Sequence, residues 1–126
     1  MKIDKSNTIS KEQIEELKNE YGHIYRTFLD GNPIIWRRLK RKEYEEITIS
    51  TADDELDLNE DEEDTPDVAR KRTARMYNRQ NMIAQAAIIY PENAMDLLNN
   101  YALAITNISD DVMARSGFDM PKSEEL

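Results

Sequence analysis

The chain has 126 residues and a mass of 14.7 kDa, enough for one domain with a modest core and too little for two ordinary ones. Its formal net charge of -9 opposes long-range attraction to nucleic acid and to anionic membranes, and no stretch has the apolar length of a membrane span. The absence of cysteine excludes disulfides, thiolate nucleophiles and zinc-thiolate sites.

The first predicted element is a short helix from Lys11 to Tyr21, which follows a flexible N-terminus of residues 1–9. Ser10 and Gln13 have the spacing of a capping box, and Gly22 is expected to end the helix. The N-terminus lacks the apolar run of a signal peptide, so we expect a cytosolic protein.

A β-hairpin is predicted next, because residues 23–29 and 33–37 are rich in β-branched and aromatic side chains. The Asp30-Gly31-Asn32 stretch between them suits a turn with positive φ, and Pro33 is tolerated at the first residue of an edge strand. Two strands alone are marginal in water, so the hairpin must pack on helices or on a partner's sheet. Its predicted anchors are the large side chains of Tyr25, Phe28 and Trp36.

A second helix is predicted from Arg41 to about Ile49, with Tyr44 and Ile47 facing inward. The same periodicity turns the acidic side chains of this helix outward, namely Glu43, Glu45 and Glu46.

Residues 53–64 form an acidic run, with nine Asp or Glu in twelve positions. A calcium loop that starts at Asp53 requires Gly at its sixth position and Glu at its twelfth, which here are Leu58 and Asp64. We therefore interpret the run as a solvated acidic linker with no metal site.

The longest predicted helix runs from Pro66 to about Ile89, with Thr65 as its N-cap. Its first half is basic and its second half is the most apolar segment of the chain. A further helix is predicted from Ala94 to Leu103, and Ser109 is expected to cap a last short helix that Gly117 stops.

These elements predict a mainly helical α+β fold with a small β-hairpin: one compact helical domain, 1–126, with an acidic loop. Residues 10–52 supply helix, hairpin and helix, and residues 65–118 supply the helical part. Residues 119–126 are expected to form a flexible tail.

The sequence carries no pattern typical of an enzyme. His23 is the only histidine and it lies at a helix-to-strand junction, so we expect an ordinary junction residue in place of a general base. With no glycine-rich phosphate loop and no Gly-x-Ser-x-Gly motif, we predict no cofactor and no catalysis. The acidic run next to the basic helix also disfavours nucleic acid as a partner.

Two blocks of sequence are more particular than a strand or a helix requires. The first is the Ile-Trp-Arg-Arg-Leu strand at 35–39, which leads into Arg-Lys-Glu-Tyr-Glu-Glu-Ile at 41–47. The second is Ile-Ile-Tyr-Pro-Glu-Asn at 88–93, followed by Ile-Ser-Asp-Asp-Val-Met-Ala-Arg-Ser-Gly-Phe at 108–118. With Ile24-Tyr25 of the preceding strand included, the two blocks span 24–47 and 88–118, about half of the chain. They resemble the small tail assembly chaperones of tailed bacteriophages.

The resemblance implies a non-enzymatic protein of the host cytoplasm that holds the tape-measure protein or a baseplate-hub component soluble during tail assembly. We expect the client to bind the apolar faces of 76–89 and 95–102, through Met76, Ile83, Ala87, Ile88, Met95, Leu98 and Tyr101. The predicted charge contacts, to the acidic run or to a partner, are Arg37, Arg38, Arg70, Arg72, Arg75 and Arg79.

A structural protein of the phage tail or baseplate is the alternative. In that case the hairpin extends a neighbour's sheet and the protein stays in the virion. A homo-oligomer remains open in both cases.

Overall fold

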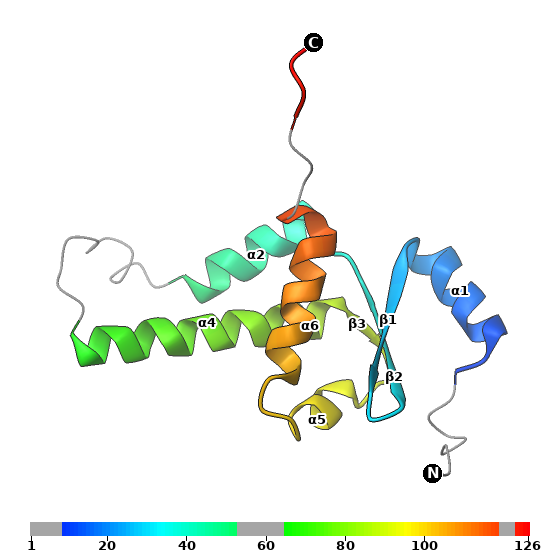
Figure 1. Ribbon diagram of the computed structural model, residues 1–126, viewed down its shortest axis with the longest axis horizontal. Helices are drawn as coiled ribbons and strands as arrows, with labels where there is room; N and C mark the ends of the chain where they lie inside the picture. Colours follow the sequence, from blue (N-terminus) through cyan, green and yellow to red (C-terminus); the bar gives the residue numbers. More distant parts are fainter. Residues whose placement is uncertain (1–8, 53–64, 119–122) are drawn as a thin grey trace.

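The computed structural model describes residues 9–52, 65–118 and 123–126 (Figure 1). Helix α1 (Lys11–Tyr21) begins as predicted, because the Ser10 side chain accepts a hydrogen bond from the Gln13 backbone N–H and the Gln13 side chain returns to Ser10. It ends at Gly22, whose φ of 80° is accessible to glycine at little cost. The predicted bounds of this helix are confirmed.

The predicted hairpin forms from β1 (Ile24–Leu29) and β2 (Asn32–Arg37), which pair in antiparallel register. The turn residues Asp30 and Gly31 both have positive φ, 49° and 78°, as the twist of a two-residue hairpin requires.

A third strand, β3 (Ile88–Tyr90), pairs antiparallel with β2, so the sheet order is β1-β2-β3. This strand was not predicted, and it makes β2 the central strand where the sequence had indicated an edge. Pro33 is nevertheless accommodated, because the β3 ladder reaches only Ile35 and Trp36.

Helices α2 (Arg41–Thr51) and α4 (Pro66–Ala87) lie side by side and run in opposite directions (Figure 1). The Thr65 side chain caps α4 by accepting from the Val68 backbone N–H at 3.2 Å, as predicted. The predicted end of α4 is wrong, since the chain leaves the helix after Ala87 and enters β3. The acidic run 53–64 lies outside the described residues.

The C-terminal part consists of α5 (Ala94–Leu98), α6 (Ala104–Met113) and a π-helical turn, η2 (Ala114–Phe118). The predicted helix from 94 to 103 is thus too long, and Ser109 caps nothing because it lies buried within α6. The helical conformation does stop at Gly117, where φ is 110°.

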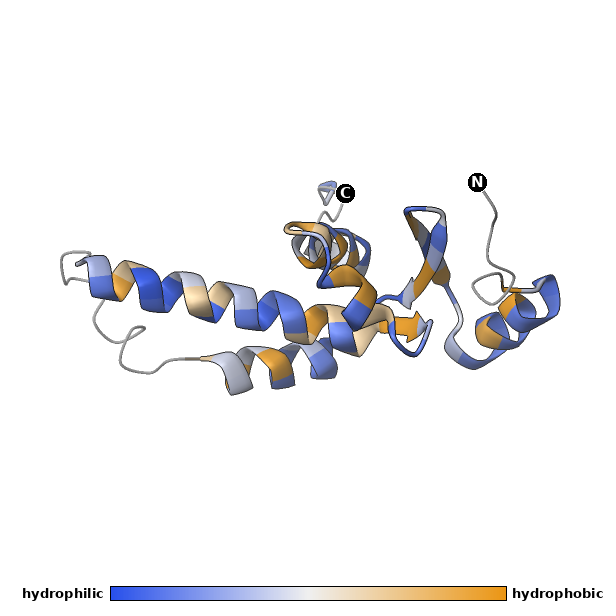
Figure 2. Cartoon of the chain, turned by 90° about the horizontal axis from the view of Figure 1, so that it is seen from below, coloured by the Kyte–Doolittle hydropathy of each residue, from blue (hydrophilic) through white to orange (hydrophobic). Residues whose placement is uncertain are grey.

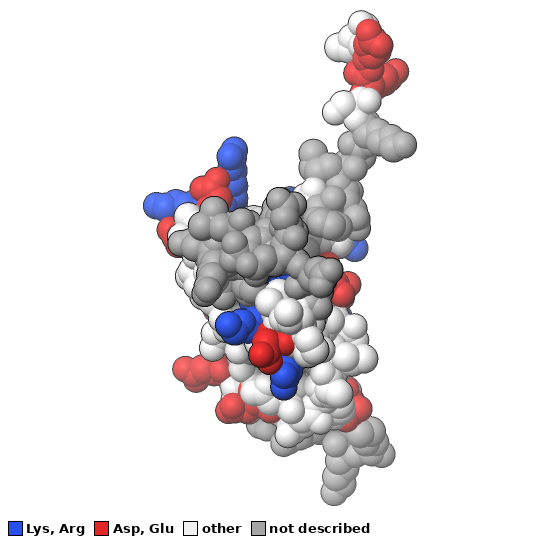
Figure 3. All heavy atoms as spheres, turned by 90° about the vertical axis from the view of Figure 1, so that its left-hand side faces the viewer, with Lys and Arg blue, Asp and Glu red and all other residues white. Residues whose placement is uncertain are grey.

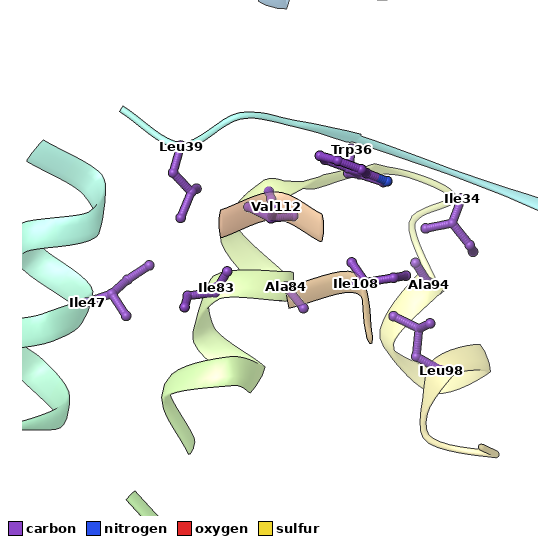
Figure 4. Close-up of a cluster of buried hydrophobic side chains, with 11 residues drawn as sticks. Ile34, Trp36, Leu39, Ile47, Ile83, Ala84, Ala94, Leu98, Ile108 and Val112 are labelled. Carbon is purple, nitrogen blue, oxygen red and sulfur yellow. The ribbon is translucent and has the colours of Figure 1, made fainter. Parts of the chain in front are cut away.

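The hydrophobic core lies where the sheet meets α4, α5 and α6 (Figure 4). In the close-up, Ile34 and Trp36 of β2 face Ala84 of α4 and Ile108 of α6. The remaining core side chains come from the other helices and from the segment after β2: Leu39, Ile47, Ile83, Ala87, Ala94, Leu98 and Val112.

Apolar residues concentrate in the C-terminal half of α4, whereas the N-terminal half is mainly hydrophilic (Figure 2). Helix α1 packs beside β1 but buries none of its residues fully. Within the described residues, no helix has the length and apolarity that a membrane crossing needs.

Candidate functional site

Two hollows on the surface are candidates for binding. The first, which we call the basic pocket, has a volume of about 640 Å³ and lies where the C-terminal end of α1, the β2–α2 connection and the end of α6 with η2 meet. It is lined by Glu20, Tyr21, His23, Arg37, Arg38, Leu39, Lys40, Glu43, Arg115, Ser116 and Gly117.

One wall of the basic pocket is fixed by an ion pair between Arg37 and Glu43. The guanidinium donates to both carboxylate oxygens, at 2.8 and 2.6 Å, and it also donates to the Ala86 carbonyl at 3.1 Å. The hydrogen bonds from Arg37 lower the pKa of Glu43 to about 2 against the opposing effect of burial, and the Lys40 backbone N–H lowers it further. The same hydrogen bonds raise the pKa of Arg37. Glu43 had been predicted to point outward, and that prediction is wrong.

The other three cationic side chains of the basic pocket form no ion pair within the described residues. Among residues 9–52, 65–118 and 123–126, no Asp or Glu lies within ion-pair distance of Arg38, Lys40 or Arg115. The Arg115 guanidinium lies over the ring of Tyr25 at 5.2 Å, and the Ser116 hydroxyl accepts the Leu39 backbone N–H at 2.9 Å. The pocket therefore has a positive wall that the described part of the chain does not neutralise.

The second hollow, which we call the amide groove, has a volume of about 350 Å³ and lies between α4 and the segment from Asn99 to Thr106. Its lining residues are Tyr77, Asn78, Gln80, Asn81, Asn99, Ala102, Ile105 and Thr106, none of which is charged. The Thr106 hydroxyl donates to the Gln80 side-chain carbonyl at 2.8 Å and so fixes α6 to α4 at the groove.

The predicted client-binding residues fall into three groups by burial. Ile83, Ala87 and Leu98 are core residues, so in the folded chain they present no surface to a partner. Ile88 and Met95 are half-buried against that core. Only Met76 and Tyr101 are exposed, and the Tyr101 hydroxyl donates to the Asp30 carboxylate at the hairpin turn.

The predicted hairpin anchors differ in burial. Trp36 is 3% exposed, stacks on Tyr25 with ring centroids 4.7 Å apart, and donates its indole N–H to the Thr27 hydroxyl at 3.0 Å. Phe28 is 61% exposed and lies under the guanidinium of Arg26, so it is not an anchor. The reason is strand alternation, which places Tyr25 opposite Trp36 and turns Phe28 to the other face of the sheet.

The arginines predicted as charge contacts occupy separate places. Arg37 and Arg38 line the basic pocket, whereas Arg70 pairs with Asp67 at 2.7 Å in the first turns of α4. Arg79 donates to the Thr51 hydroxyl at 2.9 Å and so joins α4 to α2. Arg72 and Arg75 are half-buried along α4. On the face that Figure 3 shows, the coloured basic and acidic atoms lie among one another.

His23 is exposed and lines the basic pocket. In the described part of the chain, no three His, Asp or Glu side chains are grouped so that they could hold a metal ion. Sequence reasoning missed Arg115, Ser116 and Gly117 as part of the pocket, and it missed Asn78, Gln80 and Asn81 as part of the groove. No local pattern marks these residues, because they are brought to their sites by tertiary packing.

A comparison of this chain with protein families, with curated proteins and with solved structures finds no match.

Proposed function

We propose that this chain is a non-enzymatic binding protein, and specifically a tail assembly chaperone of a tailed bacteriophage. In this proposal it holds the tape-measure protein or a baseplate-hub component soluble in the host cytoplasm until the tail tube assembles. The resemblance of residues 35–47, 88–93 and 108–118 supports the choice of tail assembly over other binding roles.

The amide groove is the observation that carries the proposal. In a chain in which 34% of the residues are charged, a groove with an entirely uncharged lining is exceptional. Asn and Gln side chains both donate and accept hydrogen bonds, so they can pair with the peptide groups of a bound segment. Tyr77, Ala102 and Ile105 add apolar contact area for its side chains.

Two exposed apolar residues are neighbours of lining residues in the sequence. Met76 precedes the lining residue Tyr77, and Leu103, which is 61% exposed, follows the lining residue Ala102. A flexible methionine and an exposed leucine suit contact with the apolar face of a client. The net charge of -9 keeps a carrier of apolar segments from aggregating.

Co-expression tests the proposal. A candidate tape-measure protein and a candidate baseplate-hub component are each produced with and without this chain, and the soluble fraction and the co-purifying proteins are measured. The proposal predicts that one of them becomes soluble only in complex with this chain. Unchanged solubility of both, with no complex, would contradict it.

A structural protein of the tail or baseplate remains the second proposal, because β1 is a six-residue strand at the edge of the sheet. An edge strand can pair with a strand of a neighbouring subunit. Mass spectrometry of purified virions separates the two proposals, since a chaperone is absent from the particle and a tail component is present in fixed copy number.

A further inference from the structure

The basic pocket concentrates positive charge in a chain whose net charge is -9. Four Lys or Arg side chains line it, against the two carboxylates of Glu20 and Glu43. Three separate parts of the fold supply the cations: the end of β2, the connection to α2, and η2. Such a convergence is a property of the folded chain, since Arg115 is remote from Arg38 in the sequence.

The ion pair of Arg37 and Glu43 leaves the pocket's excess charge on other residues. The two groups satisfy each other through both oxygens of the carboxylate, so neither is free to take a ligand. Arg38, Lys40 and Arg115 carry the remaining positive charge, and the described residues place no carboxylate within ion-pair distance of them. All three residues are exposed; the Arg115 guanidinium lies over the Tyr25 ring, and the charge of Lys40 also acts on Glu43.

We infer that the basic pocket binds a carboxylate-bearing, acidic peptide segment of a partner protein. The planar forks of Arg38 and Arg115 match the two oxygens of a carboxylate, and Lys40 adds a third cation. The Ser116 hydroxyl accepts a hydrogen bond from Leu39 and can still donate its own proton to a bound oxygen. Tyr21 and Leu39 provide apolar contact for the carbon atoms of the peptide.

The composition of the pocket favours separate carboxylates over a phosphate or a nucleic acid. Arg37 neutralises Glu43, but Glu20 also stands in the lining, and carboxylates spaced along a peptide can lie away from it more easily than the concentrated charge of one phosphate group. The net charge of the chain adds to this repulsion for nucleic acid, whose binding depends on many phosphate contacts. The pocket's volume of about 640 Å³ is also ample for two or three peptide side chains.

This inference does not rest on the proposed function. It uses a different surface from the amide groove, and it holds for any partner that presents an acidic segment. Failure of peptide binding at the pocket would leave the co-expression test of the client unaffected, and the reverse also holds.

Amide NMR spectra of the full chain, titrated with a blocked Asp-rich peptide, test the inference. We expect the shifts to concentrate at residues 20–23, 37–40 and 115–117, and to disappear at high salt. The same peptide with Asn in place of every Asp is expected to produce none of them. Shifts concentrated at Arg70 to Arg79 would overturn the inference.

Two double variants with equal charge change provide the control. Arg38→Gln/Arg115→Gln removes two cations from the pocket, and Arg70→Gln/Lys71→Gln removes two from the N-terminal end of α4. We expect the first to weaken peptide binding about tenfold or more and the second to leave it within about twofold. Equal weakening in both would show a net-charge effect and overturn the inference.

Two further arms complete the test. Replacing Arg115 removes its contact with the Tyr25 ring, and this could alter folding. The single variant Arg38→Gln, at an exposed residue, avoids this change and still tests the pocket. Inorganic phosphate is titrated in parallel as the competing anion. Saturation of the same amides by phosphate at lower concentration than by the peptide would assign the pocket to phosphate and overturn the choice of an acidic peptide.

Discussion

Arg37 and Glu43 join three elements through one bidentate ion pair. Arg37 is the last residue of β2, Glu43 lies in the first turn of α2, and the same guanidinium donates to the Ala86 carbonyl near the end of α4. Glu43 also accepts the Lys40 backbone N–H at 3.0 Å, which satisfies a donor at the start of α2. The pair therefore fixes the position of β2 relative to α2 and α4.

Replacing Glu43 with Gln is expected to lower the free energy of unfolding by about 2 kcal/mol, because Arg37 loses its charged partner in a half-buried place. Urea denaturation followed by Trp36 fluorescence measures the change. Glu45→Gln is the matched control, since Glu45 pairs with Arg41 on an exposed face and its loss should cost less than about 0.5 kcal/mol. Equal losses in the two variants would contradict the structural role of the Arg37–Glu43 pair.

The same pair predicts an acid-sensitive contribution to stability. The pKa of Glu43 is about 2 in the folded chain, below its ordinary value of 4.5, so the stabilisation is fully present above about pH 4.5 and is lost as the pH falls towards 2. Solvent screening limits the contribution to about 2 kcal/mol. Unfolding measured at about pH 6 and about pH 3 should show the difference between wild type and Glu43→Gln shrinking at the lower pH. A difference that does not depend on pH would contradict the assignment.

Trp36→Ala is expected to destabilise the chain by about 3–5 kcal/mol, because it removes a buried ring that stacks on Tyr25 and bonds to Thr27. Thermal unfolding followed by circular dichroism measures this. Phe28→Ala tests the correction to the predicted anchors, and the exposed ring should cost less than about 1 kcal/mol. An unshifted melting curve for Trp36→Ala would place Trp36 outside the core.

The elements that the sequence predicted well are those that depend on neighbouring residues. The capping box of Ser10 and Gln13 and the Asp30-Gly31 turn are local structures, and both occur where expected. Strand β3 depends instead on pairing with Ile35 and Trp36 far away in the sequence, and no break separates it from α4. The sequence therefore predicted the first residues of β3 to be the end of α4.

The start of the last helix was set by the helical spacing of its apolar residues and not by the N-cap pattern at Ser109. Ser109 followed by two aspartates is typical of an N-cap, but Ile105, Ile108 and Val112 share one face of a helix that begins earlier. The helix formed because burying that face stabilises the chain more than one cap does. The candidate sites were predicted less well than the fold, since an apolar side chain at helical spacing signals a core residue and a client contact equally.

The proposed binding of the client in the amide groove is tested with two variants. Tyr77→Ser/Leu103→Ser removes the exposed large side chain of a groove residue and that of the residue after the groove residue Ala102. Ile49→Ser, at a residue 75% exposed on α2, is the control. Each variant is co-expressed with the tail protein that wild type solubilises, and the amount of client recovered with it is measured beside the variant's own melting temperature. We expect the groove variant to lose the client while its melting temperature stays within a few degrees of that of wild type, and we expect Ile49→Ser to retain the client. Full recovery of the client by a folded groove variant would contradict the proposed binding.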